Sequence, residues 1–91
     1  MSLNPETKKK IQVLLYKVHE VQPYSKAAEG EISRLNAEFA TICEICCNEL
    51  GWDFETEYRP ALNRIQTHWN KAKYKDCISI LGSNLGVLLT I

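Results

Sequence analysis

The segment from Ala28 to Cys46 most constrains what this chain can fold into, because its apolar residues recur at alternating steps of four and three. These residues are Ala28, Ile32, Leu35, Phe39, Ile42 and Cys46. Such steps place all the side chains on one face of an α-helix, as in the seam of a helical bundle. Gly51 follows Leu50 and is a natural left-handed helix cap. We therefore predict a helix over about 25–50 that buries one face against other helices.

Another helix is predicted near the N-terminus, over about 5–21. Asn4 is a good N-cap, and Pro5 suits the first helical position because an N–H there would have no partner within the helix. The apolar residues that follow recur at three- and four-residue steps. They are Ile11, Leu14, Leu15, Val18 and Val21. Pro23 ends this pattern.

The second half of the chain predicts two more helices, over about 58–74 and 76–90. Pro60 sets the start of the first, because proline is tolerated in a first turn and disrupts later ones. Asp76 is the expected N-cap of the second. Their apolar positions are Leu62, Ile65, Trp69 and Ala72, followed by Ile78, Leu81, Leu85 and Leu88. An extended conformation of residues 86–91 is the alternative, because Val, Ile and Thr favour strands.

Helices of this kind with short connections predict an all-α fold, a small antiparallel bundle of four helices. The chain has 91 residues, of which 45% are hydrophobic. That length supplies one hydrophobic core and is too short for two. We therefore expect a single helical domain over residues 1–91.

The first residues, MSLNPETKKK, are polar and then charged, without the apolar stretch of a secretory signal peptide. The apolar runs elsewhere are far shorter than the stretch of about 20 residues that crosses a bilayer. The 11 basic and 11 acidic side chains cancel, which argues against a dedicated nucleic-acid or membrane-surface protein. We expect a soluble cytoplasmic protein without a membrane partner.

Three cysteines stand close together in the sequence CEICC, from Cys43 to Cys47, and the fourth is Cys77. In a helix they continue the apolar face, where cysteine packs as a small hydrophobe. A zinc site is the alternative, because Cys43 and Cys46 have the spacing of zinc ligands. His68 and Cys77 would then complete the set. A single CxxC without a second paired motif favours buried, reduced thiols, with no metal and no cofactor.

The sequence contains little that supports catalysis. Neither His19 nor His68 stands in a motif with a nucleophile and an orienting acid. The segment from Gly82 to Gly86 lacks the Lys-Ser/Thr ending of a phosphate-binding loop. We therefore predict that the protein is not an enzyme.

The charges are segregated along the chain. Every charged side chain from Glu44 to Glu57 is acidic, and every one from Arg59 to Lys75 is basic. A continuous third helix would align four basic residues in one stripe: Arg64, His68, Lys71 and Lys75. Such a stripe can hold the phosphates of a nucleic acid, which is the alternative function. A solvated helix face is favoured, because nucleic-acid-binding domains are usually basic overall.

The predicted fourth helix offers a surface for a partner. Gly82 and Gly86 lie one turn apart, which lets another backbone approach closely. The apolar residues around them are too many to face one core. The expected interface consists of Gly82, Gly86, Val87, Leu89 and Ile91. We expect a non-catalytic protein-interaction or assembly module that forms a homo-oligomer or binds another protein.

Overall fold

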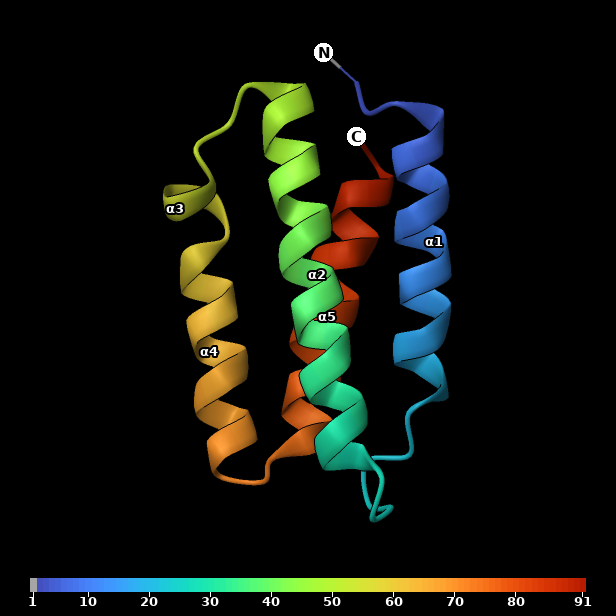
Figure 1. Ribbon diagram of the computed structural model, residues 1–91, viewed down its shortest axis with the longest axis vertical. Coiled ribbons are helices and arrows are strands. Elements are labelled where there is room, and N and C mark those ends of the chain that lie inside the picture. The colour runs from blue at the N-terminus through green and yellow to red at the C-terminus, as the bar shows by residue number, and fades with distance from the viewer. Residues whose placement is uncertain (1) are drawn as a thin grey trace.

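A computed structural model describes residues 2–91, which contain helices and no strands (Figure 1). In chain order the helices are α1 (Pro5–Glu20), α2 (Ala28–Leu50), α3 (Phe54–Glu57), α4 (Arg59–Asn70) and α5 (Tyr74–Leu89). The predicted all-α bundle is confirmed. The short helix α3 is an addition within the connection between the second and third predicted helices.

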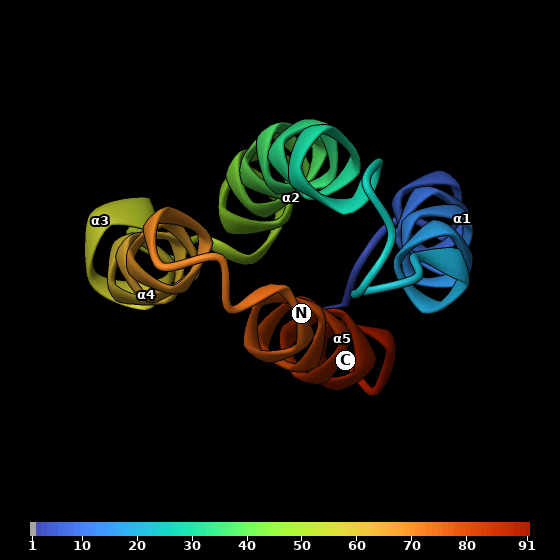
Figure 2. The same ribbon diagram turned by 90° about the horizontal axis from the view of Figure 1, so that it is seen from below.

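The four long helices run alternately up and down, so that successive long helices are antiparallel (Figure 1). α2 and α5 form the central pair, because they contact each other and each also contacts α1 and α4. α1 and α4 lie on opposite sides of this pair, and they make no close backbone contact with each other within residues 2–91 (Figure 2). α1 is therefore held by only two of the long helices, α2 and α5.

Two helix ends lie where the local sequence predicts them. α1 begins at Pro5, and Oδ1 of Asn4 accepts a hydrogen bond of 2.9 Å from the N–H of Glu6. α2 ends at Leu50, and Gly51 adopts a left-handed conformation with a φ of 72°. Both caps were predictable because each depends only on residues adjacent in the chain.

The start of α2 differs from the prediction. The helix begins at Ala28 rather than near residue 25. The chain first makes a turn, in which the N–H of Ser25 donates a hydrogen bond of 3.0 Å to the carbonyl of Gln22. The N-cap residue Ala27 has no side chain that can cap the helix.

The boundary between α4 and α5 also differs. α4 ends at Asn70 rather than near residue 74, because the chain reverses through Ala72 in a left-handed conformation with a φ of 57°. Ala72 is exposed and does not belong to the apolar stripe. α5 then begins at Tyr74, and Asp76 lies in its first turn instead of serving as the N-cap. The helix continues to Leu89, so the extended alternative for residues 86–91 is wrong.

The predicted apolar stripes meet in one core. The largest fully buried side chains include Ile11, Val18, Ile32, Phe39, Ile65, Leu81, Leu85 and Leu88. Tyr58, which follows α3, joins this core with its ring edge-on to Phe39, at a centroid distance of 6.2 Å. None of the helices within residues 2–91 has the length and apolar content that a membrane crossing requires.

Candidate functional site

The cysteines are part of the core. All four are reduced and buried. Burial raises the pKa of Cys46 to about 11, and the negative charge of Glu49 adds to this effect. Burial also raises the pKa of Cys43 and, by a smaller amount, that of Cys77. Thiols of this kind are poor nucleophiles because the reactive form is the thiolate.

The residues of the zinc alternative are not gathered into a site. Within residues 2–91, no group of three or more His, Cys, Asp and Glu side chains is placed to hold a metal ion. The Sγ atom of Cys77 instead donates a hydrogen bond of 3.4 Å to the carbonyl of Ile65. This contact joins α5 to α4 inside the core.

The predicted basic stripe does not lie on one helix. Arg64 and His68 belong to α4, Lys71 is its C-cap residue, and Lys75 lies in the first turn of α5. The left-handed residue Ala72 separates the last two, so the regular helical spacing on which the stripe depended is lost. Nucleic-acid binding through these residues stays a prediction without added geometric support.

The residues of the predicted interface on α5 do not share one environment. Gly82 faces α1, since a Cβ atom there would lie 3.8 Å from Nε2 of His19. Leu89 and Ile91 are partly buried and pack against the core. Gly86 has open space beside it, and Val87 is 62% exposed. The apolar surface available on α5 is therefore smaller than the sequence indicated.

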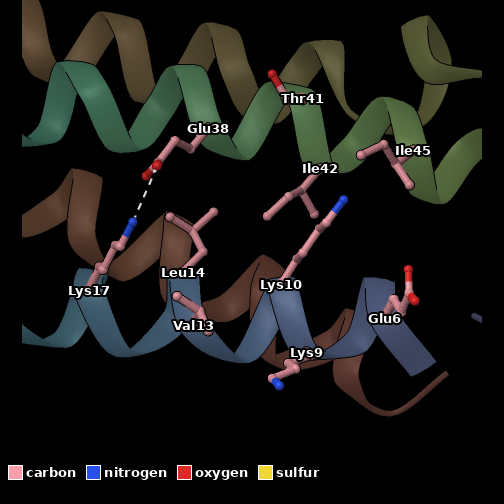
Figure 3. A pocket seen from close by; sticks show the side chains of 10 residues that line it. All are labelled: Glu6, Lys9, Lys10, Val13, Leu14, Lys17, Glu38, Thr41, Ile42 and Ile45. Carbon is pink, nitrogen blue, oxygen red and sulfur yellow. Dashed lines mark hydrogen bonds and ion pairs between the residues drawn. The ribbon is translucent and has the colours of Figure 1, made fainter. Parts of the chain in front are cut away.

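A shallow, largely apolar concave surface lies between α1 and α2. We call it the α1–α2 groove, and its volume is about 620 Å³. It is lined by Glu6, Lys9, Lys10, Val13, Leu14, Lys17, Glu38, Thr41, Ile42 and Ile45 (Figure 3). Val13 is 50% exposed although it is large and apolar, and Ile45 is partly exposed. With Leu14 and Ile42 these two residues form the apolar floor and walls of the groove.

An ion pair marks one end of the α1–α2 groove. Nζ of Lys17 lies 3.4 Å from Oε1 of Glu38, which joins α1 to α2 (Figure 3). Beyond this pair the seam between the two helices continues as a second depression. Its lining is more polar and includes Glu20, Glu31 and Arg34. The ion pair therefore separates an apolar part of the seam from a charged part.

Two other lysines line the α1–α2 groove, and their side chains differ in direction. Figure 3 shows Lys10 extending from α1 toward Ile42, whereas Lys9 points away from α2. Within residues 2–91 the ion pairs are Lys17 with Glu38 and Arg59 with Glu55, so Lys10 is in neither. Lys10 thus places an unpaired ammonium group beside the apolar floor.

This groove was not predicted from the sequence. Val13 and Ile45 lie outside the apolar stripes of their helices, and isolated apolar residues beside a stripe are common on surfaces. The weak signal was that one such residue flanks the stripe on each of two successive helices.

Comparisons with models of protein families, with curated protein sequences and with solved structures find no match for this chain.

Proposed function

We propose that this chain is a non-catalytic protein-interaction module that binds an amphipathic helix of another protein in the α1–α2 groove. The observation that carries the proposal is the exposure of apolar side chains from two helices in one concave surface of about 620 Å³. Apolar grooves between helices are a recurring site for helical peptides, whose anchors recur at three- and four-residue steps.

The dimensions of the groove suit this kind of partner. Its lining on α1 extends from Glu6 to Lys17, which corresponds to about 17 Å of helix, or about three turns. The groove is open to solvent along one side, so a helix can lie in it without entering the core. Val13 and Ile45 would become buried, and each apolar side chain that is fully buried contributes about 1.5–3 kcal/mol.

A second copy of the chain is a poorer occupant than another protein. Two α1 helices packed antiparallel around Val13 would bring Lys9 of one copy opposite Lys17 of the other. Like charges placed in this way are destabilising. The other exposed large apolar residues lie on α1, in the connections and on α5, and no two of them share a helix, so they do not form a row that would fit the groove: Tyr16, Tyr24, Trp52 and Val87.

The proposal is tested by selecting binders from a displayed library of amphipathic helices. Selected helices are expected to shift the amide signals of Val13, Ile42 and Ile45 in the labelled chain. Val13→Asp is expected to weaken binding at least tenfold, because the introduced carboxylate would lose its water when the partner covers the apolar floor of the groove. Val87→Asp is the matched control, since Val87 is similarly exposed but lies on α5.

Two outcomes would contradict the proposal. A library that yields no binder sensitive to Val13→Asp would show that the α1–α2 groove is not a helix-binding site. Binders that are lost with Val87→Asp and retained with Val13→Asp would place the interface on α5 instead. Circular dichroism on both variants establishes that each is folded before binding is measured.

A further inference from the structure

In the pairing of α1 with α2, one lysine of α1 has no carboxylate opposite it on α2. The two helices are antiparallel, and Lys17 on α1 pairs with Glu38 on α2 at 3.4 Å. Lys10 lies two turns before Lys17 on the same side of α1. The corresponding position on α2, two turns after Glu38, is Ile45. The arrangement that gives Lys17 its carboxylate therefore places Lys10 against an apolar side chain.

The other carboxylates near Lys10 do not take this role. Glu49 is close enough for the charge of Lys10 to lower its pKa, but its two oxygens accept hydrogen bonds from Thr7 and from the N–H of Asn4. Glu6 lies one turn before Lys10 and lines the groove, but no ion pair joins them. The ammonium group of Lys10 extends toward Ile42 with no carboxylate bound to it (Figure 3).

We propose that the partner helix carries an acidic side chain that pairs with Lys10 over the α1–α2 groove. The residue of α2 at the matching position is Ile45, which has no carboxylate to offer Lys10. This inference rests on the proposed function, and it specifies the chemistry of the partner. The methylene groups of Lys10 extend the apolar floor, and its ammonium group selects the acidic side chain. Bringing the partner into the groove removes water from the pair, which strengthens the attraction relative to an exposed ion pair.

Selected helices supply the first test. Helices that bind the α1–α2 groove are expected to share Asp or Glu at one position of their sequence. Lys10→Met keeps the apolar stem and removes the charge, so it is expected to weaken binding by about fivefold to tenfold. The control is Lys8→Met, because Lys8 has the same charge and lies outside the lining of the groove. Lys8→Met is expected to change affinity by less than about twofold, the weak effect of a distant exposed charge.

A double-mutant cycle separates this pairing from the proposed function. Replacing the shared acid of a selected helix by Asn or Gln is expected to weaken binding to the natural chain and to have no further effect on Lys10→Met. Binders that are lost with Val13→Asp but have no shared acid and no response to Lys10→Met would overturn the inference and leave the groove as a binding site. If no selected helix depends on Val13 for binding, both this inference and the proposed function would be overturned.

A second measurement needs no partner. Ile45→Glu supplies the missing carboxylate within the chain and is compared with Ile45→Gln, which has nearly the same size without the charge. Ile45→Glu is expected to have the higher melting temperature at low salt and neutral pH. This difference is expected to fall when Lys10→Met is added, because the introduced carboxylate then keeps only the repulsion of Glu49 one turn away. A difference between the two variants that Lys10→Met leaves unchanged would show that Lys10 does not face this position, and it would overturn the inference.

Discussion

The hydroxyl group of Thr7 donates a hydrogen bond of 2.5 Å to the Glu49 carboxylate, which ties the first turn of α1 to the last turn of α2. The other oxygen of the same carboxylate accepts a hydrogen bond of 2.7 Å from the N–H of Asn4. Both hydrogen bonds lower the pKa of Glu49, and the bond from Thr7 has the larger effect. The Glu49 side chain therefore links the start of α1 to the last turn of α2.

The first prediction concerns the pH dependence that follows from Glu49. Because the folded pKa is below the unfolded value of about 4.3, the stabilisation is present above pH 4.3 and is lost as the pH falls through the folded pKa. Melting temperatures measured between neutral pH and pH 3 should therefore fall more steeply for the natural chain than for Glu49→Gln. Parallel curves for the two proteins would contradict the role of this carboxylate.

The second prediction concerns Trp69. Its indole Nε1 donates a hydrogen bond of 2.9 Å to the carbonyl of Glu29, which joins the end of α4 to the start of α2. Trp69→Phe removes this bond and is expected to lower the free energy of unfolding by about 1 kcal/mol in urea titrations. Trp52→Phe is the control, because Trp52 is 39% exposed in a connection. An equal effect of both substitutions would mean that the hydrogen bond contributes nothing.

The third prediction concerns the thiols. Burial raises the pKa of all four cysteines, so a disulfide reagent at neutral pH should modify the native protein far more slowly than the unfolded protein. Cys43→Ser is expected to lower the free energy of unfolding by about 1–3 kcal/mol, because a hydroxyl group would be buried at that site. Cys43→Ala is the milder comparison. Rapid modification of the native chain would show that the thiols are accessible.

The fourth prediction concerns the turn between α4 and α5. Ala72 has a φ of 57°, a conformation that costs residues with a Cβ atom more than it costs glycine. Ala72→Gly is therefore expected to raise the free energy of unfolding by about 0.5 kcal/mol. Ala37→Gly, at an exposed position within α2, should lower it by about 1 kcal/mol. If both substitutions destabilise equally, Ala72 is not strained.

The fifth prediction concerns α5 and self-association. A Cβ atom at Gly86 would meet no atom within 4 Å, so Gly86→Ala should stabilise the helix by about 0.5–1 kcal/mol. Gly86→Leu adds a large side chain at the same open position. If α5 forms a dimer through this position, Gly86→Leu should dissociate it in sedimentation equilibrium. A dimer that persists in Gly86→Leu would place its contact elsewhere.

The helices and their buried faces were predictable because local sequence specifies them. The apolar spacing from Ile32 to Cys46 defines a helix face whatever it packs against, and that face is buried in the structure. The same holds for the caps at Asn4 and Gly51. The end of α4 was predicted too late, because Ala72 has no sequence signature of a left-handed turn and Trp69 is anchored by the distant carbonyl of Glu29.

By itself, the sequence determined that this chain forms an all-helical bundle, and it identified most of the side chains that fill its core. The pairing of helices was decided by tertiary structure: α2 and α5 at the centre, with α1 held against both. That arrangement partly buries Leu89 and Ile91 against the core, and it forms the groove between Val13 and Ile45. The physical reason is that the spacing of apolar residues determines which face of a helix is apolar. The angle and register between two helices depend instead on side chains that are far apart in the chain. The position of Lys10 opposite Ile45 exists only once that register is set.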